Sequence, residues 1–138
     1  MDSRACPTIL VVDDDDNDVF LLEKAFKKAG HRFTRVKDGR EAMAYLNGED
    51  PFSDRDRFPY PDCLLLDLRM PILGGLLVLE WIRQSPRHKN LHVVVSSGTD
   101  HDPEVKAANQ LGATHFSKPL NSSELVRFLD ECSRSARQ

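Results

Sequence analysis

Ile9-Leu10-Val11-Val12-Asp13-Asp14-Asp15-Asp16 joins four apolar residues directly to four aspartates. The apolar half predicts a short strand buried on both faces, because its side chains do not alternate between apolar and polar. Two carboxylates ~4 Å apart repel each other by ~4 kcal/mol at an effective dielectric constant near ~20. Aspartates at the end of a buried strand therefore favour a bound cation, although solvated charges at the start of a helix would also explain them. This run alone leaves both interpretations open.

The composition is that of one soluble globular domain. The chain has 138 residues and a net charge of −3, so a nucleic-acid-binding surface is not the leading hypothesis. No apolar run approaches the ~20 residues needed to span a bilayer, and residues 1–7 are too short and polar for a signal peptide. The cysteines Cys6, Cys63 and Cys132 are odd in number and widely spaced, with Cys63 and Cys132 expected in the core. We therefore expect a reduced, cytoplasmic protein without disulfides or a zinc site.

Strand patterns and helix patterns alternate five times along the chain. The predicted strands cover residues 8–13, 33–36, 63–67, 92–97 and 114–117. The predicted helices cover residues 19–29, 39–46, 76–84, 103–111 and 122–133. Residues 47–62 interrupt this rhythm with three prolines and are expected to form a long loop. Such alternation predicts a parallel sheet between two helix layers, with right-handed crossovers.

Polar groups stand at the carboxyl ends of the predicted strands, where ligands bind in open parallel sheets. These residues are Asp13, Asp14, Asp67, Ser97 and Lys118. Carboxylate oxygens suit Mg²⁺ before Ca²⁺, because few protein ligands leave room for water and phosphate oxygens. A carboxylate can attack phosphorus to form an acyl phosphate, while a metal ion, a lysine and a hydroxyl stabilise the phosphoryl group. The sequence has no glycine-rich nucleotide-binding motif, so it favours phosphorylation of an aspartate over nucleotide binding.

Several spaced motifs together resemble the receiver domain of two-component response regulators. They are Asp13-Asp14, Leu65-Leu66-Asp67-Leu68-Arg69-Met70-Pro71 with Gly75 beyond it, Ser97, and Lys118-Pro119. The resemblance covers residues 8 to about 133 and implies an α/β, flavodoxin-like (βα)5 three-layer sandwich whose parallel five-stranded sheet has the order 2-1-3-4-5. Residues 1–138 would then be a single receiver domain, with an N-terminal extension at 1–7, the long loop at 47–62 and a C-terminal tail at 134–138.

The resemblance gives the acidic residues distinct roles. Asp67 resembles the phosphoacceptor, Asp14 the direct metal ligand, and Asp13 the ligand that acts through water. Arg69 would contribute its backbone carbonyl to Mg²⁺, with its side chain free and solvated.

Ser97 and Lys118 resemble the residues that respond to phosphorylation. Ser97 resembles the switch hydroxyl, and Ser96 is its rival, but the strand period places Ser97 at the strand end and Ser96 one residue inside. Lys118 resembles the phosphate-pairing lysine. The family has a cis peptide bond at this point, which we expect between Lys118 and Pro119.

The sequence departs from the family pattern before Lys118 and after Asp67. The family places an aromatic switch residue three positions before the lysine, where this chain has His115, whereas Phe116 stands two positions before it. Neighbouring strand residues point to opposite faces, so either His115 replaces the aromatic residue or a local bulge restores Phe116. Gly74 stands where an acid is common, which predicts a more mobile loop before Gly75.

The remaining histidines and aromatic residues receive no functional assignment. His31, His88 and His101 are expected in turns or at exposed ends, and Trp81 is expected to pack within its helix. Phe52, Phe58 and Tyr60 would either tuck the long loop onto the domain or dock a partner.

The resemblance implies a signalling protein rather than an enzyme. A sensor histidine kinase would phosphorylate Asp67, and the long loop is similar to that of a single-domain subgroup that works with bacterial phytochromes. No helix-turn-helix is predicted, so we expect no DNA binding and no membrane contact, with output through a homodimer or target interface on the face of residues 103–111, 114–117 and 122–133. The alternatives are a phosphorylation-independent adaptor and an aspartate-nucleophile phosphatase, but the adaptor would lack part of the acid set and the phosphatase would want an acid where Arg69 stands.

Overall fold

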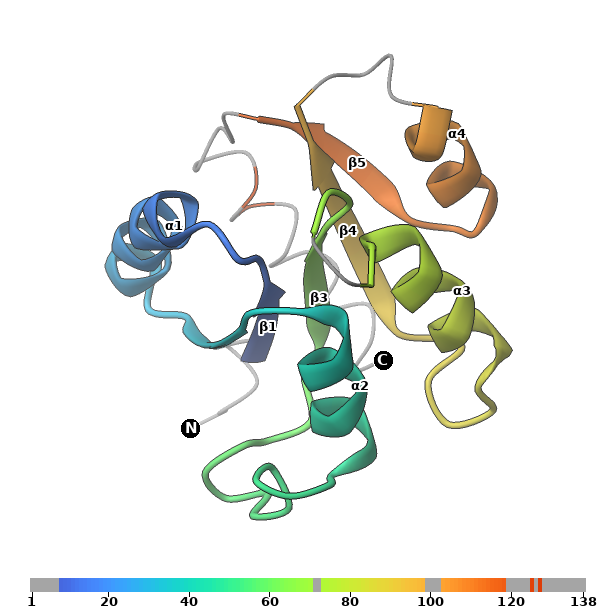
Figure 1. The fold of residues 1–138 in the computed structure, drawn as a ribbon. Helices are drawn as coiled ribbons and strands as arrows, with labels where there is room; N and C mark the ends of the chain where they lie inside the picture. Colours follow the sequence, from blue (N-terminus) through green and yellow to red (C-terminus); the bar gives the residue numbers. More distant parts are fainter. Residues whose placement is uncertain (1–7, 71–72, 99–102, 119–124, 126, 128–138) are drawn as a thin grey trace.

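The computed structural model describes residues 8–70, 73–98 and 103–118, together with Leu125 and Arg127. Strands and helices alternate along these residues (Figure 1). They are β1 (Thr8–Val12), α1 (Asp16–Ala29), β2 (Arg32–Val36), α2 (Gly39–Asn47), β3 (Cys63–Asp67), α3 (Gly75–Gln84), β4 (His92–Ser97), α4 (Pro103–Gln110) and β5 (Thr114–Ser117). Each strand or helix that the sequence predicted in this part of the chain is present, with most ends within one residue of the prediction.

The strands form one parallel sheet in the order β2-β1-β3-β4-β5. This order confirms the flavodoxin-like topology that the motifs implied, with the carboxyl ends of β1 and β3 side by side at the centre. Val12 is paired with Leu66, and Asp67 with Ser96, so the residues that follow β1 and β3 emerge at the same edge of the sheet.

The two faces of the sheet take alternate residues of each strand. Leu10, Val12, Leu64 and Leu66 belong to a core cluster that α2, α3 and α4 cover. Their sequence neighbours, such as Val11 and Leu65, pack with Phe26 of α1 on the other face. Burial on both faces explains why these strands are continuous apolar runs in the sequence.

The ends of α1 follow from local side-chain chemistry. The carboxylate of Asp15 accepts hydrogen bonds from the backbone N–H groups of Asn17 and Asp18, which caps the helix start. Gly30 ends the helix at φ 80°, a left-handed conformation that costs a glycine little. The first two aspartates therefore follow β1, and the last two cap and begin α1.

The segment between α2 and β3 is an ordered loop at the amino end of the sheet, at the bottom of the view in Figure 1. The Arg55 guanidinium donates to the main-chain oxygens of Leu46 and Phe58, which closes the loop onto the end of α2. Phe52 and Phe58 pack against Tyr45 with ring centroids 5.1 and 6.0 Å away. Of the two possibilities for these phenylalanines, the structure supports packing onto the domain.

His88 was expected in a turn or at an exposed end and is instead buried beside this loop, with 1% of its surface exposed. Its Nε2 lies 3.0 Å from Oδ1 of Asn47, and its Nδ1 lies 2.7 Å from the Tyr60 hydroxyl. An amide oxygen only accepts, so Nε2 carries the hydrogen and Nδ1 accepts from Tyr60. The prediction failed because the partners come from positions 47 and 60, which no local pattern connects to residue 88.

Some expectations concern residues outside those described. They are the N-terminal extension, the C-terminal tail, most of the helix at 122–133, Cys6 and Cys132, and the cis bond between Lys118 and Pro119. Cys63 is buried and unbridged, as expected. Among the described residues, the structure contains no helix with the length and hydrophobicity that crossing a membrane requires.

Candidate functional site

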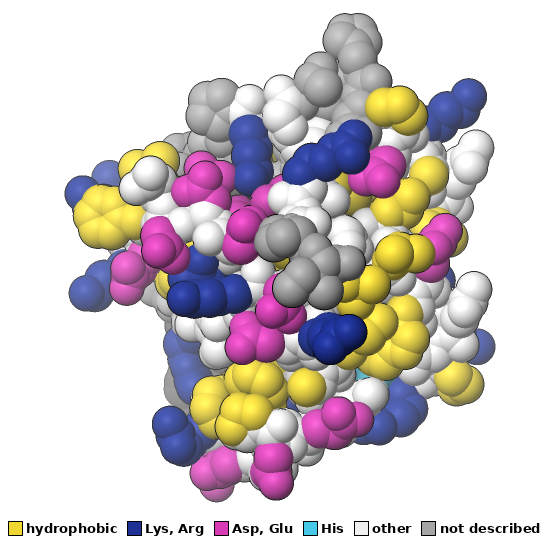
Figure 2. Space-filling model, viewed as in Figure 1, with side chains coloured by type: hydrophobic (Ala, Val, Ile, Leu, Met, Phe, Trp, Pro, Cys, Tyr) yellow, Lys and Arg dark blue, Asp and Glu magenta, His cyan; other side chains and the backbone are white. Residues whose placement is uncertain are grey.

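Three carboxylates meet at the carboxyl ends of β1 and β3. Asp13, Asp14 and Asp67 each place a carboxylate oxygen within 4.8 Å of the others. Asp13 and Asp67 are buried, with 3% and 4% of their surfaces exposed, whereas Asp14 is exposed. Figure 2 shows acidic side chains gathered around the start of α1, with basic side chains beside them. The sequence therefore identified this acid set correctly as one cluster.

Backbone hydrogen bonds fix the two buried carboxylates. Asp13 Oδ1 accepts the N–H of Asp15 at 2.9 Å, and Asp67 Oδ1 accepts the N–H of Arg69 at 3.1 Å. These bonds hold one oxygen of each carboxylate, so the other oxygen of each group faces the site.

Lys118 lies at the centre of the acids. Its Nζ is 2.8 Å from Oδ2 of Asp18, 3.2 Å from Oδ2 of Asp67 and 3.6 Å from Oδ2 of Asp13. The backbone N–H of Lys118 donates to the oxygen of Ser97 at 2.7 Å, which places the start of the side chain beside the end of β4. A single ammonium group is thus shared by three carboxylates.

Burial and neighbouring charge set the proton affinities of these groups. Burial raises the pKa of Asp13 to about 6, although the Asp15 N–H and the Lys118 charge act in the opposite direction. Burial also raises the pKa of Asp67, against the Arg69 N–H and Lys118. Burial alone would lower the pKa of Lys118, but the hydrogen bond to Asp18 and the charges of Asp67 and Asp13 outweigh it and raise that pKa. Burial therefore makes the ionised form of both acids less favourable, whereas the acids around Lys118 favour its charged form.

The acid cluster fits a hard divalent cation. Its ligand atoms are carboxylate oxygens, two of them on buried groups, and Asp13 and Asp67 share one lysine. A cation such as Mg²⁺ supplies further positive charge and keeps room for water and phosphate oxygens.

Ser97, the last residue of β4, and His115 of β5 form a partly buried polar pair. Ser97 Oγ lies 2.8 Å from Nε2 of His115. The strands β4 and β5 pair without interruption, from Val94 with Thr114 to Ser97 with Ser117. Phe116 packs against the core cluster of α1 on the opposite face. No bulge therefore brings Phe116 toward Ser97, and His115 takes the position that the family gives to an aromatic residue.

Ser96 is buried like Ser97 and is the register partner of Asp67. Its main-chain oxygen accepts the N–H of Leu68 at 2.9 Å. Ser97 is one residue nearer the strand end, as the strand period predicted.

The Arg69 side chain is exposed, as expected, but it has an ionic neighbour. Its Nη1 lies 3.7 Å from the Glu104 carboxylate in the first turn of α4. The expectation of a free guanidinium was therefore wrong. The contact connects the segment after the acid site to α4.

Sequence reasoning missed two charged residues of the site. Asp18 holds Lys118, and Arg35 of β2 donates from Nε to the main-chain oxygen of Asp13 at 2.8 Å while its Nη2 pairs with Asp16 at 2.9 Å. Asp18 could have been found, because it is an acid in the first turn of the helix that directly follows β1 and so begins at the same edge of the sheet. Arg35 had no such signal, since its contact depends on the pairing of β2 with β1.

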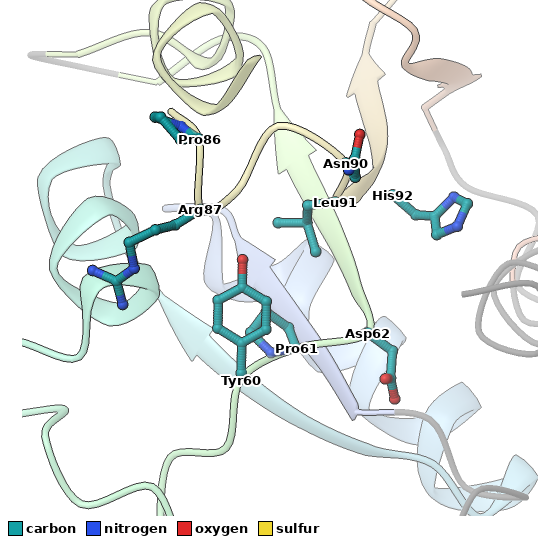
Figure 3. A pocket seen from close by; sticks show the side chains of 8 residues that line it. All are labelled: Tyr60, Pro61, Asp62, Pro86, Arg87, Asn90, Leu91 and His92. Atoms are coloured by element: carbon teal, nitrogen blue, oxygen red, sulfur yellow. The ribbon is translucent and has the colours of Figure 1, made fainter. Parts of the chain in front are cut away.

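A hollow of about 220 Å³ lies at the opposite, amino end of the sheet (Figure 3). Its lining comes from the end of the loop and from the segment before β4: Tyr60, Pro61, Asp62, Pro86, Arg87, Asn90, Leu91 and His92. Because the strands are parallel, this hollow is separated from the acid cluster by the length of the sheet. It plays no part in the site.

Comparison with known proteins agrees with the geometry. The profile of the response regulator receiver domain matches residues 9–130. The chain is 33% identical over 123 residues to the DNA-binding transcriptional regulator NtrC of Salmonella typhimurium, covering 88% of this chain but 24% of NtrC. It thus spans about a quarter of the length of this curated relative.

Solved structures resemble the chain over nearly its whole length. The bacteriophytochrome response regulator RtBRR has a TM-score of 0.78 at 30% identity, with 91% of this chain and 77% of that chain covered. The phosphorylated cyanobacterial phytochrome response regulator RcpA has a TM-score of 0.77 at 31% identity, with 92% and 91% covered.

Proposed function

The chain belongs to the response regulator receiver domain family, and we propose that it accepts a phosphoryl group on Asp67 from a sensor histidine kinase. One observation carries the proposal: Asp13, Asp14 and Asp67 form a partly buried acid cluster with the Lys118 ammonium inside it. Such a cluster can bind a cation, attack phosphorus and neutralise the phosphoryl group within one small volume.

The chemistry follows from the placement of the groups. A carboxylate oxygen of Asp67 attacks the phosphorus of a phosphohistidine, the phosphorus–nitrogen bond breaks, and the electron pair leaves with the imidazole. Lys118 attracts the phosphoryl oxygens through its charge, and the Ser97 hydroxyl can donate to one of them. Asp13, Asp14, Asp67 and the main-chain carbonyl of Arg69 would hold Mg²⁺, which supplies further neutralisation of the transferring group.

The proposal extends to the partners. RtBRR and RcpA are response regulators of phytochromes by their descriptions, which supports a phytochrome-type histidine kinase as the donor. We place the protein in the cytoplasm and assign it a signalling role rather than an enzymatic one. Its signal would be a phosphorylation-driven change of a protein-binding surface on α4 and β5, which is also the proposed surface for a homodimer.

The test is covalent labelling. The protein is incubated with Mg²⁺ and a small phosphodonor such as acetyl phosphate, and its intact mass is measured over time. The parent should gain one phosphoryl group, and a chelator added before the phosphodonor should prevent this labelling. Asp67→Asn should gain none, because an amide is a poor nucleophile.

The matched control is Asp56→Asn, which removes an exposed carboxylate from the loop at the other end of the sheet. It should label like the parent. Equal labelling of Asp67→Asn and the parent would sink the proposal, as would a parent that never gains the phosphoryl mass.

A further inference from the structure

The shortest contact of Lys118 is with Asp18 rather than with the proposed phosphoacceptor. The Nζ–Oδ2 distance is 2.8 Å to Asp18 and 3.2 Å to Asp67. Asp18 lies in the first turn of α1, outside the set of three acids that meets at the strand ends. Its carboxylate therefore competes with Asp67 for the same ammonium group.

Backbone hydrogen bonds fix the main chain of both Asp18 and Lys118, independently of the contact between their side chains. The Asp18 N–H donates to the Asp15 carboxylate that caps α1, and the Lys118 N–H donates to the main-chain oxygen of Ser97. The side chains are only 32% and 22% exposed, so water screens the pair less than it screens a surface ion pair. Because both backbones are already fixed, only side-chain rotamer freedom is lost when the ion pair forms.

The position of the ammonium matters for chemistry at Asp67. A lysine that settles fully on Asp67 withdraws charge from the attacking oxygen and competes with a cation for the same carboxylates. A lysine that leaves the site cannot attract the phosphoryl group. A residue that holds the Lys118 amine between these two positions therefore affects both cation binding and phosphoryl transfer.

We propose that Asp18 is a positioning residue for phosphoryl transfer: it draws the Lys118 ammonium partly away from Asp67 and Asp13 and keeps it ready for the incoming group. This inference rests on the proposed function. When Asp67 is phosphorylated, its single carboxylate charge is replaced by a phosphoryl group that carries about −1.5 to −2, and Lys118 moves from Asp18 toward it. Asp18 thus acts through Lys118 and does not touch the reacting atoms.

The first experiment observes Lys118 in the metal-free, unphosphorylated protein by NMR of lysine ammonium groups. Asp18→Asn should shift the Lys118 ammonium signal. Asp16→Asn should leave it in place, because Asp16 also lies in the first turn of α1 but its carboxylate is 81% exposed and pairs with Arg35. The two variants remove the same charge from the same turn, so a general effect on the helix start would affect both.

The second experiment is a double-mutant cycle. In the parent, Asp18→Asn should weaken Mg²⁺ binding and slow labelling by a small phosphodonor at saturating Mg²⁺, each by about threefold or more. In a Lys118→Met background the same substitution should have a much smaller effect, because the amine it controls is gone. Asp18→Glu, which keeps the carboxylate, should restore most of the loss.

An unchanged Lys118 signal in Asp18→Asn, or equal effects of this substitution with and without Lys118, would overturn the positioning role. Failure of the proposed function gives a different result, since the parent itself would then not label. Circular dichroism of each variant checks that α1 remains folded.

Discussion

Aspartates close together in the chain have different environments and therefore different properties. Asp13 is buried, Asp14 is exposed, Asp15 caps α1, Asp16 pairs with Arg35, and Asp18 holds Lys118. The structure divides the run: Asp13 and Asp14 join the acid cluster, and Asp15 and Asp16 serve the helix start. The pKa of one member makes this difference measurable.

We expect the affinity for Mg²⁺ to fall as the pH drops below about 6. Burial raises the pKa of Asp13 to about 6 in the metal-free protein, so a proton competes with the cation below that value. Well below it, the dissociation constant should rise by about tenfold per pH unit. Calorimetric titrations across this range measure the effect. A constant affinity from about pH 5 to about pH 7.5 would contradict it.

His88 should make the folded state sensitive to acid. Burial lowers the pKa of His88, and the charges of Arg87 and Arg55 lower it further. The unfolded chain keeps the ordinary value of 6.5, so it gains a proton there while the folded protein does not. The stabilisation that comes from neutral His88 is therefore complete when the pH is above the ordinary histidine pKa of 6.5, and it is lost as the pH falls below that value.

The measurement compares urea unfolding of the parent and His88→Gln at about pH 7.5 and about pH 5.5. The parent should lose more stability on acidification than the variant. Asp13 has the opposite sign, because its raised pKa makes protonation favour the folded state, and its effect cancels in the comparison. Identical losses in the two proteins would show that His88 does not titrate as proposed.

At the level of elements, the start of α3 packs directly against the end of β3. A Cβ atom on Gly75 would lie 2.3 Å from the main-chain oxygen of Asp67 and 2.9 Å from Cα of Leu68. Neither backbone atom can move without displacing the proposed phosphoacceptor. The glycine is therefore required by close approach rather than by its own backbone conformation.

Gly75→Ala should destabilise the protein by about 1–3 kcal/mol and reduce labelling of Asp67, because β3 and α3 must separate. Gly74→Ala is the matched control, since its Cβ would meet the Leu68 oxygen at 3.6 Å, an ordinary contact. Thermal unfolding and intact mass measure both variants. Equal behaviour of the two alanine variants would show that the close approach is not needed.

The elements themselves were predictable from local patterns. The apolar runs of β1, β3 and β4 are buried on both faces, so they are visible in the sequence. The ends of α1 are marked by residue types that favour helix ends, Asp15 at the start and Gly30 at the end. The closed loop at 48–62 was not predictable from local patterns. Its hydrogen bonds join Arg55 to Leu46 and His88 to Tyr60, which are not neighbours in the sequence. The acid cluster was predictable because parallel strands bring their carboxyl ends together. The ion pair between Asp18 and Lys118 was not, because it joins the first turn of α1 to the residue that follows β5.

For the whole molecule, two routes connect the acid site to the face of α4 and β5. Arg69, two residues after Asp67, contacts Glu104 of α4. Lys118 adjoins β5, where His115 is bonded to Ser97. The closed loop, by contrast, is held at the other end of the sheet by its own contacts.

Hydrogen exchange with and without a phosphoryl mimic such as beryllofluoride should therefore change at residues 103–118 and remain constant at 48–62. The change requires Asp67, so Asp67→Asn treated in the same way serves as the control. Altered protection confined to 48–62 would move the output surface to the loop.

Among the described residues, β2 and β5 each pair with one strand only and form the two edges of the sheet. Exposed edge strands can pair with strands of other chains, and charged side chains or a short edge strand reduce this pairing. The β2 edge carries Arg32 and Arg35, and the β5 strand has only four residues. Crowded copies of this domain should therefore resist stacking into continuous sheets and fibrils. Any self-association should therefore occur through side-chain surfaces rather than through backbone hydrogen bonds between strands. A change of charge can reverse the first kind of contact but not the second.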